Sequence, residues 1–227
     1  FVVQGKDQVP NAALVPFWDD LKKKYDKFIN LSESVEGSLL SIIGRTSHGW
    51  PKALAHKMMN MNYMEMVHDL AEIPYNFGQK FYPTEEEKVW AKAEKKKMGG
   101  TVILWSLAGS AFHKTWPWLD TAIARLMIKN PEVKIVLCGD TLCQLLEQGW
   151  EKEPRVFCRS GKWSIRESLS FAQIADIVIG PETGILNAVG LETVPKIIML
   201  SHSSVENLTK HWKNTVALEP KTDCYPC

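Results

Sequence analysis

The sequence of 227 residues lacks the features that mark several large classes of protein. No apolar run approaches the roughly 18–20 residues that a membrane-spanning helix needs. Neither sign of charge dominates, since 27 basic and 26 acidic side chains leave a net charge of +1. The concentrated basic face that nucleic-acid binding requires is therefore not indicated. With 45% hydrophobic and 23% charged residues, the composition is typical of a globular protein that buries a substantial core.

Several ligand-binding signatures are also missing. Neither the Walker pattern G-x-x-x-x-G-K-[ST] nor the dinucleotide pattern G-x-G-x-x-G occurs. There is no acidic D-x-D pair, and the six histidines show no metal-ligand spacing such as H-x-x-x-H. We therefore expect neither a metal ion nor a resident cofactor, and we interpret the histidines as surface or capping residues.

The five cysteines are an odd number, and two of them, Cys224 and Cys227, form a C-x-x-C pair. Cys138 ends an apolar, strand-like run and Cys143 follows a turn, which suits reduced thiols in a cytosolic protein. For the C-x-x-C pair three interpretations stay open: free thiols, half of a metal cluster, or a redox pair.

The chain divides near Pro83. Thr84 followed three residues later by Glu87 is a capping-box pattern, which predicts a helix over Glu85–Met98 that a pair of glycines ends. We predict three segments in chain order: a partial acceptor-side α/β domain over residues 1–83, a helical connector over 84–100, and a ligand-binding domain over 101–227.

Beyond residue 100, short apolar runs alternate with segments of helical periodicity. The predicted strands are Thr101–Ser106, Lys134–Cys138, Val156–Cys158, Ile177–Ile179, Lys196–Leu200 and Thr215–Leu218. The predicted helices are Trp118–Lys129, Thr141–Gln148, Ile165–Ile174, Ile185–Gly190 and Val205–Lys210. Because short apolar strands joined by helices form right-handed crossovers, we predict a Rossmann-like parallel sheet that is buried on both faces.

The region before Pro83 is less regular. We predict a helix at Asp19–Tyr25, a strand at Lys27–Leu31 and the start of a helix at Ser38–Ile43. Five methionines lie within Met58–Leu70 and invite a membrane or cofactor interpretation, but methionines more often fill gaps between packed helices. We expect this region to be the second part of an α/β unit whose beginning is missing, so that the chain is a fragment.

Two polar loops follow predicted strands, and ligands of parallel sheets bind at that edge. The first loop runs from Leu107 to Pro117. In it, Gly109 permits close backbone approach, Ser110 offers a hydroxyl, and Lys114 places a cation beside a helix start. This arrangement stabilises a diphosphate. His113 is a further candidate for a phosphate contact.

The second loop is Gly180–Asn187, after the predicted strand Ile177–Ile179. A carboxylate at Glu182 and a hydroxyl at Thr183 precede Gly184, which opens a helix. Glu182 can accept hydrogen bonds from sugar hydroxyls, and the first amides of the helix can bind an oxyanion. The alternative is that Glu182 and Thr183 only cap the helix.

Together these loops resemble the heptosyltransferase-like family of glycosyltransferases, which add sugars to the lipopolysaccharide core. The resemblance covers Lys24–Cys227 and includes Tyr25–Leu31, which is similar to a strand of the family's acceptor-side domain. Its main motifs occur in the family's order: Lys114-Thr115-Trp116-Pro117, Ser164-Ile165, Glu182-Thr183-Gly184-Ile185-Leu186-Asn187 and Cys224-Tyr225-Pro226-Cys227. Where the family has Asp and His in the third motif, this chain has Glu182 and Asn187.

The resemblance implies an α/β fold of the GT-B type, in which two Rossmann-like domains face a cleft and the second binds a nucleotide-activated sugar. It implies that Lys114 and Ser110 hold the diphosphate. Trp163 falls where the family places a residue against the nucleotide base, although an ordinary surface or core tryptophan is the alternative. The remaining implied contacts to the donor sugar and phosphates are Gly109, Glu182, Thr183, Gly184 and Asn187.

The implied reaction is inverting transfer from an ADP-heptose-like nucleoside-diphosphate sugar to a saccharide or lipopolysaccharide-type acceptor. Lys114 would stabilise the leaving diphosphate as a catalytic group without a metal ion. The family's general base is an acidic residue in an early loop, which we expect to lie upstream of Phe1; Glu33 and Glu36 are weaker candidates. We therefore expect poor turnover by this chain, in the cytoplasm or peripherally at the inner membrane face.

Two alternatives stay open. The first is a non-catalytic nucleotide-sugar binding protein or a degenerate transferase paralogue. The second is a sugar-nucleotide epimerase, which has less support because the sequence shows no pairing of a histidine with a carboxylate for proton abstraction.

Overall fold

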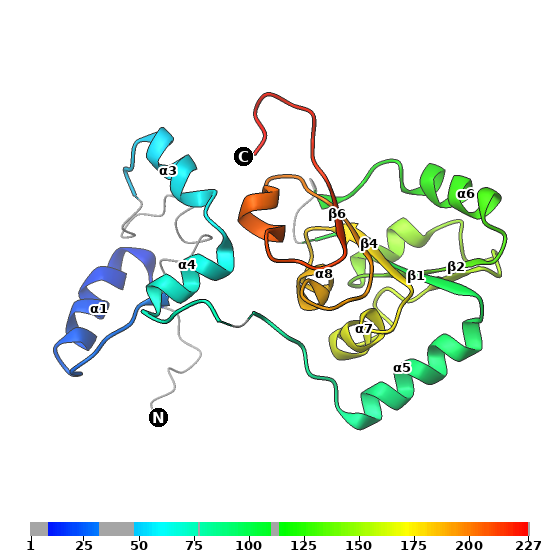
Figure 1. Cartoon of the computed structure of the whole chain (residues 1–227), viewed down its shortest axis with the longest axis horizontal. Helices are drawn as coiled ribbons and strands as arrows, with labels where there is room; N and C mark the ends of the chain where they lie inside the picture. The colour runs from blue at the N-terminus through cyan, green and yellow to red at the C-terminus, as the bar shows by residue number, and fades with distance from the viewer. Residues whose placement is uncertain (1–8, 32–47, 77, 110–113, 227) are drawn as a thin grey trace. The chain divides into compact units, whose positions relative to one another are not determined.

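The computed structural model describes residues 9–31, 48–76, 78–109 and 114–226. The chain forms two compact units (Figure 1). The first comprises Phe1–Gly78 and Glu206–Leu208, and the second comprises Gln79–Val205 and Thr209–Cys227. No helix in the described ranges is long and apolar enough to cross a membrane.

The regular secondary structure described in the first unit is all helical. Its elements are η1 (Asn11–Ala13), α1 (Leu14–Lys22), α3 (Lys52–Met59) and α4 (Tyr63–Leu70). Asn62 caps α4, because its side-chain oxygen accepts hydrogen bonds from the amides of Met64 (3.1 Å) and Glu65 (3.3 Å). The methionine-rich segment is therefore two helices with a break between them, and of its methionines only Met66 is fully buried.

The predicted strand at Lys27–Leu31 is wrong. Residues 27–30 have no regular structure, and Ile29 and Leu31 are 40% and 47% exposed. A strand needs a neighbour for its backbone hydrogen bonds, and the described part of this unit contains no other strand. The helix predicted at Asp19–Tyr25 ends earlier, at Lys22. The predicted helix start at 38–43 lies outside the described residues, as do Glu33 and Glu36.

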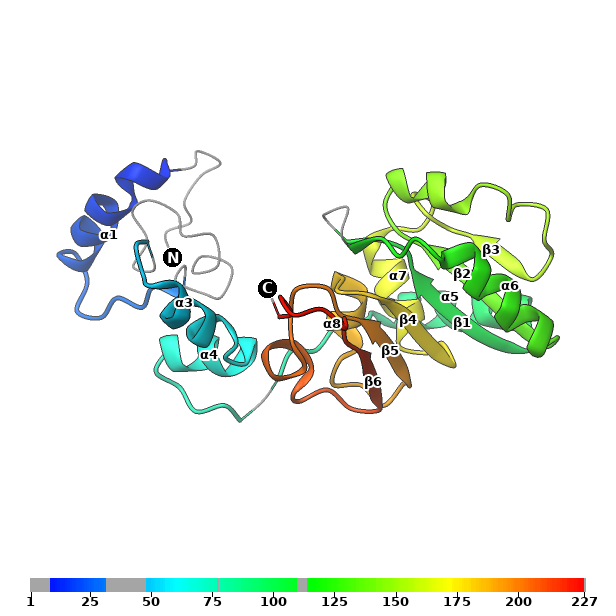
Figure 2. The same ribbon diagram turned by 90° about the horizontal axis from the view of Figure 1, so that it is seen from above.

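Six parallel strands form the centre of the second unit (Figure 2). They are β1 (Thr101–Ser106), β2 (Val133–Cys138), β3 (Val156–Cys158), β4 (Ile177–Pro181), β5 (Lys196–Met199) and β6 (Thr215–Leu218). Their order is β3-β2-β1-β4-β5-β6, so the direction of strand addition reverses between β1 and β4. β1 pairs with both neighbours, Thr101 lying opposite Val133 and Ile103 opposite Ile177. The predicted parallel sheet is confirmed, with all six strands placed within two residues.

Helices cover both faces of this sheet. They are α5 (Glu85–Met98), α6 (Leu119–Lys129), the 3-10 helix η4 (Leu142–Glu147), α7 (Ile165–Ala172) and α8 (Gly184–Val189). The π-helical turn η5 (Val205–Thr209) contains Glu206–Leu208, which belong to the first unit. Ile123 of α6 packs on Ile103 and Trp105 in one core cluster. Successive strand side chains alternate, so the neighbouring Leu104 faces the other side, where α5 and α7 lie (Figure 1).

Helix α5 belongs to the second unit. Its predicted capping box is present, with Thr84 Oγ1 accepting from the amide of Glu87 (3.2 Å) and Glu87 Oε2 accepting from the amide of Thr84 (2.7 Å). Ala91 and Met98 are buried, and Gly99 ends the helix with φ = 66°. The segment that we predicted as a connector is therefore packed against the sheet domain.

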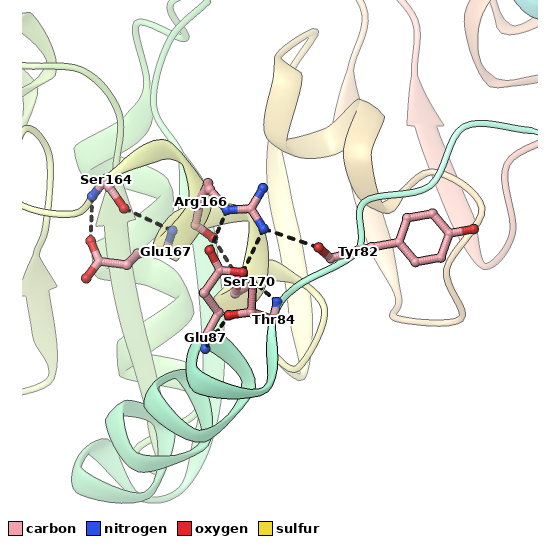
Figure 3. A network of polar contacts seen from close by, with 7 residues as sticks. All are labelled: Tyr82, Thr84, Glu87, Ser164, Arg166, Glu167 and Ser170. Carbon is pink, nitrogen blue, oxygen red and sulfur yellow. Dashed lines mark hydrogen bonds and ion pairs between the residues drawn. The ribbon is translucent and has the colours of Figure 1, made fainter.

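Arg166 of α7 binds residues at the start of α5 and just before it (Figure 3). Its guanidinium binds both carboxylate oxygens of Glu87, with an Nη2–Oε2 distance of 2.8 Å, and donates to the carbonyl of Tyr82 (3.2 Å). The hydrogen bonds from Arg166, and then from the Thr84 amide, lower the pKa of Glu87 to about 2. The side chain of Gln173 donates to the carbonyl of Phe81 (2.8 Å). The segment leading into α5 is thus held along α7, the helix whose first turn borders the site described next.

Candidate ligand-binding site

A cavity of about 630 Å³ lies at the carboxyl edge of the sheet. Residues that follow β1, β2, β3 and β4 line it, together with the first turns of α7 and α8; among them are Ala108, Asp140, Gly161, Trp163, Thr183 and Gly184. The cavity therefore spans the position where the strand order reverses. Parallel α/β sheets bind ligands at this place, and the volume falls in the range of small-molecule sites.

Trp163 lines one part of the cavity and is held by other rings. It packs edge-on against Trp90 with ring centroids 5.1 Å apart, and at a tilt against Phe171 at 4.8 Å. The guanidinium of Arg159 lies 5.9 Å from its ring centroid. The indole is thus both part of the packing and part of the cavity wall, and its contact with a nucleotide base stays a prediction.

Thr183 and Gly184 lie at the end of β4 and line the cavity. The hydroxyl of Thr183 accepts from the amide of Leu186 (3.5 Å) and so caps α8, and it is hydrogen-bonded to the hydroxyl of Ser106 (3.1 Å). A Cβ atom added at Gly184 would meet no atom within 4 Å, because the space in front of it is open. The capping role of Thr183 and a place in the cavity are therefore compatible.

The loop after β1 approaches the loop after β4 closely at Gly109. A Cβ atom at this glycine would lie 2.5 Å from Cδ of Lys114 and 3.1 Å from the carbonyl oxygen of Glu182. The absence of a side chain thus allows Lys114 to pack across the loop, and it brings both loops to one edge of the sheet. Ser110 and His113 lie outside the described residues.

Glu182 is buried, with 6% of its surface exposed, and its carboxylate faces the loop after β5. Oε1 accepts hydrogen bonds from the amides of Ser201 (2.8 Å), His202 (3.3 Å) and Ser203 (3.0 Å). Oε2 lies 3.3 Å from the hydroxyl of Ser201 and 2.6 Å from Nδ1 of His202. A carboxylate offers about four lone-pair positions, so these contacts occupy it fully. In this arrangement neither oxygen of Glu182 is left to accept a hydrogen bond from a donor sugar, which is the contact that the sequence suggested.

The environment of Glu182 favours its ionised form. Burial raises the pKa of this carboxyl, but the hydrogen bonds from His202 and from the loop amides together outweigh burial and hold the pKa below its ordinary value. The carboxylate is therefore charged at neutral pH and acts as an anchor for the loop after β5.

The pairing of Glu182 with His202 was missed in the sequence, where His202 was interpreted as a surface or capping residue. The two residues are 20 positions apart and come together because β4 and β5 are neighbours. The available signal was that each follows a predicted strand. The argument against an epimerase rested on the absence of such a pair, and that argument no longer holds.

Asp140 was also missed. It follows β2 directly after Gly139 and lines the cavity, and its Oδ1 accepts from the amide of Cys143 (3.0 Å) at the start of η4. A Cβ atom at Gly139 would lie 2.4 Å from Sγ of Cys143, so the glycine is needed for this tight turn. Applying the strand-end rule to every predicted strand would have found this carboxylate.

Asn187 lies outside the cavity lining as far as the chain is described. Its side-chain amide donates to the carbonyl of Thr183 (3.2 Å), and its own carbonyl accepts from Gln79 (2.7 Å). The residue thus fastens α8 to the strand end and to the segment before α5.

Comparison with known proteins shows that this chain is similar in fold to solved structures. No protein-family model matches the sequence, and no curated protein does. A glycosyl transferase of family 9 from Veillonella parvula DSM 2008 aligns with a TM-score of 0.62 and 16% identity over 73% of this chain and 51% of its own. The E. coli ADP-heptose LPS heptosyltransferase II aligns with a TM-score of 0.58 and 13% identity over 92% of this chain and 72% of its own. The chain has the fold of these glycosyltransferases.

This likeness confirms the predicted α/β fold class of the GT-B type. The chain spans about half the length of the Veillonella protein. The strand order reverses between β1 and β4, and both the reversal and the cavity beside it lie within the second unit.

Three buried cysteines of this unit are not placed for chemistry. Cys138, Cys143 and Cys158 are free and buried, and burial raises the pKa of each thiol, that of Cys143 to about 11. They stay protonated and unreactive at neutral pH. Cys224 is exposed and Cys227 lies outside the described residues, so the three interpretations of the C-x-x-C pair remain. Within the described ranges no group of three or more metal-ligating side chains is placed to hold a metal ion.

Proposed function

We propose that the second unit binds a nucleoside-diphosphate sugar and that the protein is an inverting, metal-independent glycosyltransferase. The observation that carries this proposal is the cavity at the strand-order reversal of a sheet with a glycosyltransferase fold. By analogy with the name of the E. coli neighbour, the donor would be of the ADP-heptose type and the acceptor a saccharide or lipopolysaccharide-type glycolipid. Such an acceptor would bring a cytoplasmic enzyme to the inner membrane face.

The end of the cavity beside β2 and β3 suits the nucleoside. Trp163 offers an indole that its ring neighbours hold in place, and a base can stack on such a surface. Asp140 adds carboxylate oxygens, which accept hydrogen bonds from ribose hydroxyls in related nucleotide folds.

The region between β1 and β4 suits the diphosphate. Among the described residues no carboxylate forms an ion pair with Lys114, so its charge is available for an anion. Gly184 leaves room for a phosphate to approach the backbone, and the hydroxyl of Thr183 precedes it, while Gly109 lets Lys114 pack beside the loop after β4. Ser110 and Asn187 complete the proposed donor site, Asn187 through its support of α8.

The reaction would be a single displacement. The acceptor hydroxyl attacks the anomeric carbon, the bond from that carbon to the diphosphate oxygen breaks, and the configuration inverts. Lys114 would stabilise the negative charge that develops on the leaving nucleoside diphosphate, the role that a metal ion plays elsewhere. The proton of the acceptor passes to a general base, which the resemblance places on an acidic residue of the acceptor-side domain.

Saturation-transfer NMR with a panel of ADP-, GDP-, UDP- and CMP-sugars tests this proposal. We expect transfer to the base and ribose protons of at least one donor, and its loss in Trp163→Ala. The matched control is Trp118→Ala, which removes an indole that is 65% exposed at the start of α6. Absence of transfer to any of the four donors would contradict the proposal.

A further inference from the structure

We propose that Ser168 of α7 recognises the nucleobase of the donor, its hydroxyl forming a hydrogen bond with the polar edge of a base that stacks on Trp163. This inference rests on the proposed function and adds to it a residue that determines which nucleotide the site prefers. It starts from a buried side chain that lines the cavity and whose hydroxyl has no hydrogen-bond partner in the described part of the chain.

Ser168 is a polar residue on the apolar side of α7. Positions 168, 171 and 172 are three and four residues apart, so they lie on one side of the helix. Phe171 and Ala172 are fully buried there, and Ser168 is 7% exposed. Ser168 is also part of the cavity lining, which Phe171 and Ala172 are not. The apolar stripe of α7 therefore changes to a hydroxyl where it passes from the core to the cavity.

The helix does not use this hydroxyl. A buried serine within a helix often donates to the carbonyl four residues earlier, as Ser170 does to Arg166 at 2.8 Å. The Ser164 hydroxyl caps α7 by accepting from the amide of Glu167 (3.2 Å). No described residue forms such a bond with the hydroxyl of Ser168. Because a buried hydroxyl without a partner costs free energy, a ligand that supplies the partner gains from this arrangement.

The surroundings of Ser168 suit a base better than a sugar or a diphosphate. The other cavity residues in and just before α7 are Trp163, Ile165 and Leu169, and all three are apolar. A base has two apolar faces and a polar edge, so one hydroxyl among apolar side chains matches it. A sugar or a diphosphate carries polar groups on every side and needs several polar partners.

Ser168 also lies along the indole on which the base would stack. Trp163 precedes α7, and its ring centroid is 4.8 Å from that of Phe171 in the second turn of the helix. The indole therefore runs along the first two turns, the stretch that carries Ser168. Stacking on an indole tolerates every base, whereas a hydrogen bond to the edge distinguishes one base from another.

Calorimetry with ADP, GDP, UDP and CDP tests the inference on the full chain. Ser168→Ala removes the hydroxyl, and Ser168→Cys replaces it with a weak hydrogen-bonding group of similar size. Two controls remove other buried hydroxyls. Ser170→Ala changes the same helix outside the cavity lining, and Ser160→Ala removes a hydroxyl that also lacks a partner in the described chain but belongs to a fully buried residue outside the lining.

We expect the wild type to prefer one base. Ser168→Ala and Ser168→Cys should lower the affinity for that diphosphate about three- to tenfold, as loss of one hydrogen bond does, and leave the other three within about twofold. Both controls should keep the preference of the wild type. The thermal midpoint of Ser168→Ala should stay the same or rise, because the change breaks no hydrogen bond within the described chain.

Several results would overturn this inference and leave the proposed function standing. They are a wild type without a preference, equal losses for all four diphosphates, a preference that survives in either Ser168 variant, and the same loss of preference in a control. Equal losses would place the hydroxyl against the ribose or the phosphates. A wild type that binds none of the four would overturn the proposed function and this inference with it.

Discussion

Lys114 and Glu182 were both predicted as donor contacts, and the structure gives them different surroundings. The side chain of Lys114 packs over Gly109, while Glu182 is buried under the loop after β5. The first is suited to meet an anion directly. The second supports a neighbouring side chain, because its oxygens are already used.

For Lys114 we predict a loss of binding without a loss of stability. Lys114→Ala should weaken the affinity for a nucleoside diphosphate by about 1.5–3 kcal/mol, the range for a hydrogen bond to a charged group. The free energy of unfolding should hardly change, because a partly exposed lysine adds little to packing. Calorimetry measures the affinity, and urea denaturation measures the free energy of unfolding. Lys129→Ala at the exposed end of α6 is the control and should leave both unchanged; an equal loss of affinity in this control would argue against a local contact.

For Glu182 we predict a loss of stability that depends on pH. Its pKa is lowered in the folded state, so its contribution is fully present above the unfolded pKa near 4.5 and is lost as the pH falls through the folded value. Glu182→Gln should therefore reduce the free energy of unfolding by about 1.5–3 kcal/mol at pH 7, with a smaller difference from wild type below pH 4.5.

The control for this experiment is Glu167→Gln, since Glu167 caps the exposed start of α7 through the amide of Ser164 (2.6 Å). We expect a cost of about 1 kcal/mol or less for this change. A stable Glu182→Gln protein whose only defect is poor use of the intact donor would support the direct sugar contact in place of the anchoring role.

At the scale of elements, the junction of β1 and β4 depends on a glycine. A Cβ atom at Gly180 would lie 2.8 Å from the carbonyl oxygen of Ser106, whereas one at Gly184 would meet no atom within 4 Å. We predict that Gly180→Ala lowers the free energy of unfolding by about 1–3 kcal/mol through overpacking. Gly184→Ala should cost under about 1 kcal/mol and weaken donor binding, since the added methyl group occupies cavity space.

Thermal denaturation and calorimetry on the two variants separate these effects. If Gly180→Ala were as stable as the wild type, or if Gly184→Ala bound the donor normally, the close approach of β1 to β4 or the position of the cavity would be refuted.

The elements of the second unit could be predicted because their signals are local. Apolar runs such as Thr101–Ser106 and the capping box at Thr84 depend on neighbouring residues, and both were placed correctly. Lys27–Leu31 was wrong because an apolar run alone does not provide a pairing partner. The contact between Glu182 and His202 was invisible because it depends on which strands are neighbours, and strand order is a property of the folded chain.

At the scale of the whole molecule, the site combines loops from four strands of one sheet. The nucleoside region and the Lys114 region lie at different strands, so a ligand has to extend between them to use both. We predict that a nucleoside diphosphate binds more tightly than the corresponding monophosphate, because only the longer ligand reaches Lys114. Calorimetry with ADP and AMP checks this; equal or weaker binding of ADP would show that the loop after β1 is not the phosphate site.

The acceptor side stays a prediction. The regular secondary structure described in the first unit is helical. The likeness to the E. coli heptosyltransferase extends over 92% of this chain and therefore includes part of this unit. The proposal that this unit binds a saccharide or glycolipid therefore rests on the similarity in fold and on the resemblance in sequence motifs.

The central claim is that the cavity at the reversal between β1 and β4 holds a nucleotide sugar. Its most direct test is an amide chemical-shift titration of the labelled protein with the preferred nucleoside-diphosphate sugar. We predict that the largest shifts map to the cavity wall, at Ala108, Asp140, Gly184 and the indole of Trp163. Saturable shifts confined to other parts of the chain, with these four positions unmoved, would contradict the account.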